Sequence, residues 1–226
     1  MKKLFLIPAR GGSKGLPRKN ILPLVGKPMI CYTIDAAKEA MNQGDELCIS
    51  TDDSEIILVL NKQGIEVPFV RPKELASDKA STEQVINHAI HWYKAKGISF
   101  DMIVLLQPTS PLRTGKHIME ALNLWNGNID MVVSVKETEA NPYYVLFEEN
   151  DSGFLRKSKK GNFTRRQDCP KVYEYNGAIY LFSADNFINK GLAGFSKIKK
   201  SVMPKLSSID IDDLTDFMIA EYLIKN

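Results

Sequence analysis

Several features that would assign a protein to a specialised class are scarce in this sequence. Its 226 residues contain only three histidines and three cysteines, and Cys31, Cys48 and Cys169 form no CxxC pair. Neither a disulfide framework nor a zinc site is therefore expected. No apolar run approaches the ~18 residues needed to cross a bilayer. Thirty basic and 27 acidic side chains leave a net charge of only +3, which is too small to suggest a nucleic-acid-binding surface.

The beginning of the chain also lacks the pattern of a secretion signal. After Met1, Lys2 and Lys3, the apolar stretch 4–9 stops at Arg10. This is short of the ~7–15 apolar residues expected of a signal peptide, and no small-residue cleavage site follows. The same stretch fits a buried strand. We therefore expect a cytoplasmic, soluble and reduced protein that binds neither nucleic acid nor membrane.

Short apolar runs alternate with helix-like segments over the first 135 residues. The runs expected to be strands are 4–9, 46–51, 67–70, 102–107 and 131–135. The segments whose apolar spacing predicts helices are 30–41, 54–60, 85–93 and 118–125. This alternation predicts an α/β fold with a mainly parallel central sheet flanked by helices.

The pattern changes between residues 141 and 180, where aromatic and charged residues alternate with turn signals and no helix is indicated. Too few apolar residues remain there to build a separate core. We therefore expect a single domain over 1–226 with an inserted antiparallel arm at approximately 138–172. A returning strand over 178–182 and a closing helix over 215–224 complete the expected fold.

The loop after the first strand combines glycine with positive charge. Three glycines free the backbone to approach a ligand, and four cations lie within ten residues: Arg10, Lys14, Arg18 and Lys19. Ligands of open α/β sheets bind outside the carboxyl ends of the strands, and backbone N–H groups with cations suit a polyphosphate there. Neither GxxxxGK[ST] nor GxGxxG is present, and a solvated basic turn is the alternative.

Five sequence blocks carry a resemblance to a known family. They read IPARGGSKGLPRKN at 7–20, RPKELASDKAST at 71–82, LLQPTSPLR at 105–113, RRQDCPKVYEYNGAIY at 165–180 and SIDIDDLTD at 208–216. In this order they resemble the acylneuraminate cytidylyltransferases, the CMP-sialic acid synthetases. These enzymes couple CTP to a nine-carbon 2-keto acid sugar and release pyrophosphate. The resemblance covers nearly the whole chain and implies a Rossmann-like nucleotidyltransferase fold.

The resemblance implies a nucleotide site formed by the first three blocks. Its implied members are Arg10, Ser13, Lys14, Lys19, Asn20, Arg71, Thr82 and Gln107. Fixed cations would stabilise the departing pyrophosphate more than the intact triphosphate. An amide such as that of Asn20 suits a pyrimidine edge. For Arg71, a charge at the rim of the site is the alternative role.

Two carboxylates near the end of the chain indicate a metal site. In an extended segment residues i and i+2 face the same side, so Asp210 and Asp212 would lie together while Ile209 and Ile211 enter the core. Like charges repel unless a cation joins them, and Mg²⁺, with Mn²⁺ as a substitute, prefers such oxygen ligands. The family uses this pair for the metal. The alternative is an N-cap for the last helix, formed by Asp212 or Asp213.

The resemblance also implies a sugar site and a set of catalytic residues. The implied sugar-binding residues are Gln107, Arg166, Asn176 and Tyr180, with Arg166 clamping the sugar carboxylate. The implied catalytic residues are Arg10, Lys19, Gln107 and Asp212. Gln107 cannot act as a general base. The family's basic residue after 135 and its aromatic pair near 189–195 are absent. Sialic, legionaminic and pseudaminic acids therefore all stay open as substrates.

The expected activity is cytidylyl transfer from CTP to a nonulosonic acid, the nine-carbon keto sugar acid of this family. CMP-Kdo synthesis, a catalytically inactive CTP-binding module and a glycosyltransferase are the alternatives. The arm carries exposed-looking aromatic residues, which suggests a homodimer, and the family dimerises through a comparable arm.

Overall fold

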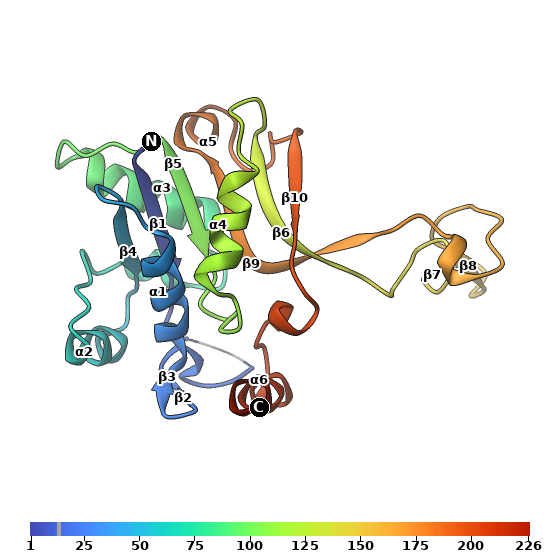
Figure 1. Cartoon of the computed structure of the whole chain (residues 1–226), viewed down its shortest axis with the longest axis horizontal. Coiled ribbons are helices and arrows are strands. Elements are labelled where there is room, and N and C mark those ends of the chain that lie inside the picture. Colours follow the sequence, from blue (N-terminus) through green and yellow to red (C-terminus); the bar gives the residue numbers. More distant parts are fainter. Residues whose placement is uncertain (13–14) are drawn as a thin grey trace.

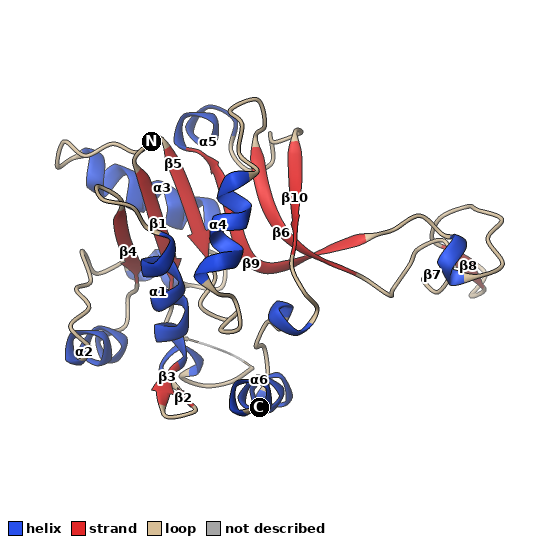
Figure 2. Ribbon diagram, in the orientation of Figure 1, coloured by secondary structure: helices blue, strands red, loops and turns tan. Residues whose placement is uncertain are grey.

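The structure, a computed structural model, describes residues 1–12 and 15–226. Six strands form one sheet in the order β10-β6-β9-β5-β1-β4 (Figure 1, Figure 2). They are β1 (Lys3–Pro8), β4 (Glu46–Ser50), β5 (Met102–Leu106), β6 (Met131–Glu137), β9 (Tyr173–Ser183) and β10 (Ile198–Val202). β9 runs antiparallel between β5 and β6, and the other pairs are parallel. The predicted α/β class with a mainly parallel sheet is confirmed.

Helices cover both faces of this sheet. They are α1 (Met29–Ala40), α2 (Ser54–Lys62), α3 (Thr82–Lys94), α4 (Gly115–Asn123) and α5 (Ala184–Lys190). The helix α6 (Leu214–Lys225) packs instead in a separate buried cluster. Side chains of a strand alternate between its faces, and β1 follows this rule. Phe5 and Ile7 pack in one buried cluster with α1, α2 and α4, whereas Leu4 and Leu6 pack in another with α3 and α5.

The structure differs from the expected elements in the helix α5 and a short hairpin over 23–28, which were not predicted, and in two strands. The predicted strand over 67–70 does not form, and only a parallel bridge between Thr51 and Val70 occurs there, since Pro68 has no N–H to donate to a ladder. The edge strand β10 was not predicted, because its sequence IKKSV is rich in lysine rather than apolar. Lysine on an edge strand discourages pairing with other chains.

Two small hairpins extend from the main sheet. β2 (Pro23–Leu24) pairs with β3 (Lys27–Pro28). Leu24 packs in a third buried cluster with Ile211 and with Phe217 of α6. β7 (Phe147–Glu149) pairs with β8 (Leu155–Lys157) within the segment between the end of β6 and the start of β9. Figure 1 shows this antiparallel arm projecting far from the sheet.

Candidate active site

A cavity of about 480 Å³ opens at the carboxyl ends of β1 and β5, and Pro8 and Gln107 contribute to its wall. The rest of the lining comes from the loop after β1, the segment before α3 and the loop after β5. Asp212 also lines it, from the segment 208–213, which we call the acidic segment. The predicted residues that line this cavity are Arg10, Lys19, Asn20, Arg71, Thr82, Gln107 and Asp212. Segments nearly 200 residues apart in sequence thus share one site.

At Gly15 the glycine-rich loop approaches the acidic segment so closely that a side chain would not fit. A Cβ atom on Gly15 would lie 2.3 Å from the carbonyl oxygen of Asp212. The Lys19 ammonium contacts the Ile211 carbonyl and lies 3.3 Å from Asp212 Oδ1. The cationic loop and Asp212 therefore meet at one cavity, whereas Asp210, the other member of the predicted metal pair, lines a separate smaller cavity. Ser13 and Lys14 lie outside the described residues.

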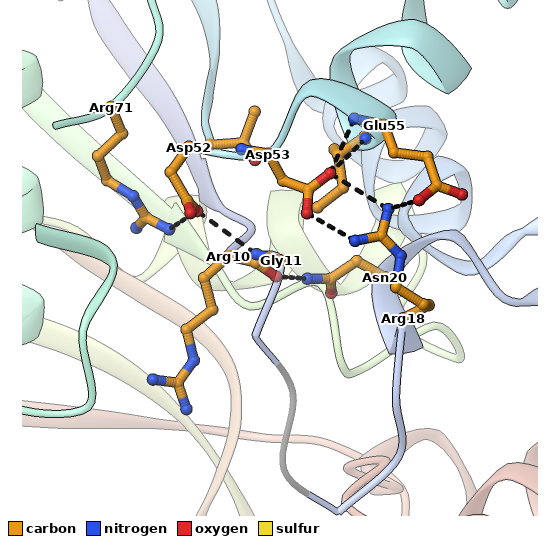
Figure 3. A network of polar contacts seen from close by, with 10 residues as sticks. Arg10, Gly11, Arg18, Asn20, Asp52, Asp53, Glu55 and Arg71 are labelled. Atoms are coloured by element: carbon orange, nitrogen blue, oxygen red, sulfur yellow. Dashed lines mark hydrogen bonds and ion pairs between the residues drawn. The ribbon is translucent and has the colours of Figure 1, made fainter. Parts of the chain in front are cut away.

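Two aspartates that follow β4 hold the glycine-rich loop in place (Figure 3). Asp53 caps α2 by accepting hydrogen bonds from Glu55 N–H and Ile56 N–H, and it also binds the Arg18 guanidinium at 2.7 Å. A Cβ on Gly11 would lie 1.9 Å from Asp53 Oδ2, so only glycine fits there. The sequence predicted that a helix starts here, but it did not predict that the residues after β4 contact the glycine-rich loop.

Asp52 connects the loop to a buried arginine. Its Oδ1 accepts a hydrogen bond from Gly11 N–H at 3.4 Å and lies 3.5 Å from Arg71 Nη2, as Figure 3 shows. Burial lowers the pKa of the Arg71 guanidinium, and Asp52 offsets part of that effect. Arg71 Nε and Nη2 have no hydrogen-bond partner among the described residues. A buried, weakly paired guanidinium beside a cavity is suited to an anionic or carbonyl ligand.

Arg10 and Asn20 present polar groups to the cavity from the same loop. The Asn20 amide nitrogen donates to the Arg10 carbonyl at 2.9 Å, while Asn20 Oδ1 accepts no hydrogen bond from the described residues. The Arg10 guanidinium donates to Asp78 Oδ1 at 2.7 Å. Asp78 also lines the cavity.

The amino end of α3 faces the cavity. Ser81 is its N-cap and forms a reciprocal capping box with Gln84, and Ser81 and Thr82 both line the cavity wall. The N–H groups and dipole at a helix amino end favour a negatively charged ligand. This contribution adds to the cations of Arg10, Lys19 and Arg71.

The aspartates of the acidic segment do not all have the same role. Asp213 caps α6 through a capping box with Asp216, which leaves Asp210 and Asp212 for another role. Burial raises the pKa of Asp210; a hydrogen bond with Thr109 lowers it and the charge of Asp212 raises it further. In the part of the chain that the structure describes, no group of three or more His, Cys, Asp or Glu residues is arranged to hold a metal ion.

A smaller cavity of about 190 Å³ is lined by Lys136, Tyr175 and Asp210, together with Asn176 and Asp216. Asn176 is buried, and its amide is used internally. Its Oδ1 accepts from Ser134 Oγ at 2.6 Å, and its Nδ2 donates to Ser208 Oγ at 2.9 Å.

Two predicted sugar-binding residues lie outside both cavities as described. The Tyr180 ring packs edge-on against Tyr175, and burial raises the pKa of its hydroxyl, with a further contribution from Asp210. Arg166 lies on the exposed arm, with its Nη1 3.5 Å from Glu139 Oε2. The structure thus brings the predicted nucleotide residues together, whereas it leaves the predicted sugar residues dispersed.

None of the described helices has both the length and the apolar character needed to span a bilayer.

Comparison with known proteins identifies a family that this chain matches over most of its length. A family model described as cytidylyltransferase matches residues 4–217. A pseudaminic acid cytidylyltransferase of Campylobacter jejuni is 33% identical, over 100% of this chain and 97% of the relative. An N-acylneuraminate cytidylyltransferase of Streptococcus agalactiae is 36% identical over 96% of this chain, and the match spans 52% of that longer protein.

Among solved structures, a CMP:2-keto-3-deoxy-manno-octonic acid synthetase complexed with CTP superposes with a TM-score of 0.70. The match covers 100% of this chain and 99% of the other at 19% sequence identity. This likeness concerns the fold.

Proposed function

Because this chain belongs to the cytidylyltransferase family, we propose that it transfers the cytidylyl group of CTP to a nonulosonic acid and releases pyrophosphate. The observation that carries this proposal is the cavity itself. Arg10 and Lys19 line it from the loop after β1, and Arg71 lines it from the segment before α3, beside the amino end of that helix. A triphosphate is the ligand class whose charge matches this arrangement.

The proposed reaction is a single in-line displacement. The anomeric hydroxyl oxygen of the sugar acid attacks the α-phosphorus of CTP. An O–P bond forms, the bond from that phosphorus to the pyrophosphate oxygen breaks, and the hydroxyl proton passes to solvent. Negative charge accumulates on the departing pyrophosphate, where Arg10 and Lys19 would stabilise it. Arg10 would exchange its contact with Asp78 for a phosphate oxygen.

The residues present fit a divalent metal ion, with Mg²⁺ as the proposed ion and Mn²⁺ as a substitute. Asp210 and Asp212 supply hard oxygen ligands, and the Asp212 side chain is 82% exposed beside Lys19. Mg²⁺ uses one or two carboxylates and completes its shell with phosphate oxygens and water, so two aspartates suffice. When bound, the ion would neutralise the triphosphate and lower the pKa of the attacking hydroxyl.

Nucleotide recognition is proposed for Asn20, Arg71, Thr82 and Gln107, and the loop residues Ser13 and Lys14 stay predicted contacts. The sugar acid would lie between Gln107 and the smaller cavity that contains Asp210. Tyr180 would border this region, and Asn176 would shape it through its internal hydrogen bonds. We also propose a cytoplasmic location, since three free cysteines suit a reducing compartment.

A homodimer would give the arm a role in the sugar site. Phe154 and Leu155 at its tip are about 70% exposed, which is unusual for a monomer. Arg166 lies on this arm, and its predicted ligand is a carboxylate. We propose that the arm of one protomer supplies Arg166 to the sugar site of its partner. Light scattering at micromolar concentration should then give twice the chain mass; a monomer would contradict the dimer.

A mixing experiment tests whether Arg166 acts across the dimer. Arg166→Gln and Asp212→Ala chains, each inactive alone, are unfolded together and refolded. If Arg166 acts in the partner's site, one site in each mixed dimer is intact, so about a quarter of wild-type activity should return. No recovery in a mixture shown to contain mixed dimers would restrict Arg166 to its own chain.

The central experiment follows pyrophosphate release with CTP, Mg²⁺ and a panel of keto sugar acids. The panel contains N-acetylneuraminic, legionaminic, pseudaminic and the eight-carbon Kdo acids. Release with a nine-carbon acid is expected. Release with Kdo alone would make the protein a CMP-Kdo synthetase. Calorimetric CTP binding without turnover of any acid would indicate a catalytically inactive CTP-binding module.

A further inference from the structure

The side chain of Arg113 is the largest among the fully buried ones, with 1% of its surface exposed. It lies in the loop between β5 and α4. Its Nη1 donates to the Gln107 carbonyl at 3.1 Å and to the Ala178 carbonyl at 3.0 Å. Within residues 1–12 and 15–226, no carboxylate forms an ion pair with it, and its Nε and Nη2 have no hydrogen-bond partner.

Stability does not explain a guanidinium in this position. A buried charge is costly unless it is paired and hydrogen-bonded, and burial lowers the pKa of Arg113 to about 9. Replacing a buried ion pair with apolar side chains of similar volume is often neutral or stabilising, and Arg113 lacks even a charged partner in the described part of the chain. A methionine would fill much of the same space without desolvating a charge, and against this gain stands only the loss of the two hydrogen bonds to the Gln107 and Ala178 carbonyls.

The contacts of Arg113 instead determine where the cavity wall lies. Gln107 and Thr109 both line the cavity just after β5. The Arg113 guanidinium holds the carbonyl of Gln107, and two residues later the Thr109 carbonyl accepts the Ile211 N–H at 2.8 Å. Ile211 in turn contacts Lys19 through its carbonyl. A chain of contacts therefore leads from Arg113 to Lys19 and the acidic pair.

The second carbonyl held by Arg113 reaches the same region from β9. Ala178 follows Gly177, whose φ is +75°. A Cβ at Gly177 would lie 3.2 Å from Asp210 Oδ2, so the backbone of β9 directly borders that carboxylate. Arg113 thus joins the antiparallel strands β5 and β9 at the point where β5 leads into Gln107 and β9 borders Asp210.

We infer that Arg113 is a positioning residue for the transfer reaction: it fixes Gln107 and the acidic segment relative to each other, and it contacts no substrate itself. This inference rests on the proposed function for its kinetic consequence but not for its structural one. Misplacement of reacting groups by about 1 Å can cost on the order of 100-fold in rate, so a loss in kcat rather than in CTP binding is expected.

Lys3 provides a matched control, because it is also a buried cation of the same sheet. It pairs with Asp45 at 2.8 Å at the opposite end of β1, and among the described residues Lys3 does not line the cavity. We compare Arg113→Met, Arg113→Lys and Lys3→Met by urea unfolding, steady-state kinetics and amide hydrogen exchange. The exchange measurement follows peptides over 105–110 and 208–213, which include the Ile211 N–H.

For Arg113→Met we expect a urea midpoint close to that of the wild type, because removal of the buried charge offsets the two lost hydrogen bonds. We expect a kcat lower by about 10–100-fold and a CTP KM changed by less than about threefold. Exchange over 208–213 should accelerate about tenfold or more. Arg113→Lys, which keeps the charge and can donate hydrogen bonds, should recover part of both losses. Lys3→Met should lose stability without changing kcat or exchange over 208–213.

A folded Arg113→Met enzyme with wild-type kcat and wild-type exchange would overturn the inference. If that variant does not fold, Arg113→Gln replaces it with the same two criteria. If the wild-type protein transfers no cytidylyl group, the proposed function fails, and the exchange comparison alone decides whether Arg113 positions the acidic segment.

Discussion

The two ends of the central sheet differ in how their buried cations are paired. At the amino end, Lys3 is paired with Asp45, whose Oδ1 also accepts the Lys3 N–H. At the carboxyl end, the buried guanidinium groups of Arg71 and Arg113 each leave two nitrogens without a hydrogen bond among the described residues. Satisfied polar groups stabilise a fold, whereas unsatisfied ones persist at sites where a ligand or a constraint compensates for them.

This contrast teaches that burial alone does not indicate the role of a charged residue. The amino end should govern stability with little effect on activity, and the carboxyl end should govern activity with little effect on stability. The following predictions, together with the Arg113 experiment, test that division from the largest expected effect to the smallest.

Asp212→Ala should have the largest effect. It removes the carboxylate beside Lys19 at the cavity, one of the two proposed metal ligands, so turnover should fall by roughly 10³-fold, about 4 kcal/mol. Because the side chain is exposed, the unfolding midpoint should hardly change. Asp213→Asn is the matched control in the same segment: asparagine also caps helices, and activity should be kept. An active Asp212→Ala enzyme would refute the metal assignment.

Lys3→Met tests the amino end. It leaves the Asp45 carboxylate buried without its partner, so the free energy of unfolding should fall by about 3 kcal/mol. Urea unfolding measures this loss, and kcat of the folded enzyme should stay within about twofold of wild type. A parallel loss of kcat in fully folded protein would break the division between the two ends.

Arg10→Met tests the carboxyl end with a residue that is not buried. It removes a cation proposed to hold the pyrophosphate, so kcat/KM should fall by about 30-fold, roughly 2 kcal/mol. Lys116→Met, which removes an exposed cation from α4, is the control and should have no effect. Raising the salt concentration should weaken CTP binding in the wild type more than in Arg10→Met.

The pH dependence of stability should be the smallest effect. Burial raises the pKa of Asp45, but hydrogen bonds from Lys3 and from backbone N–H groups outweigh it and hold the pKa below its ordinary range. The unfolded chain therefore takes up a proton at a higher pH than the folded one. This stabilisation is present above about pH 4 and is lost as the pH falls further. Asp45→Asn should flatten the acid limb of a urea-midpoint profile; an unchanged limb would contradict the assignment.

The sequence predicted much of the fold because the deciding signals are local. Apolar runs and helical stripes placed most elements within a few residues, and the five blocks identified the family, which the family match and the full-length relatives confirm. The errors have local causes too. Pro68 interrupts an apolar run, and the edge strand β10 reads IKKSV, in which two lysines obscure the apolar pattern of a strand.

The site was predicted unevenly for a physical reason. Cations and glycines after a strand are visible in the sequence, since the carboxyl ends of parallel strands meet at one edge. Asp52 and Asp53 follow β4 at that same edge, so their contacts with the loop could have been inferred from this rule. No local signal indicated that Arg113 is buried, because one of the two carbonyls it binds belongs to Ala178 in β9, which is 65 residues away in sequence.

The order of residues by itself determined the family, the alternation of strands and helices, and the chemical character of the two ends that meet at the cavity. Only the tertiary structure decided that Asp213 caps a helix while Asp212 faces Lys19, and that Asn176 is committed to internal hydrogen bonds. Chemistry is a property of side chains, which a sequence records. Whether a side chain is free to act depends on its neighbours, and packing brings those from distant parts of the chain.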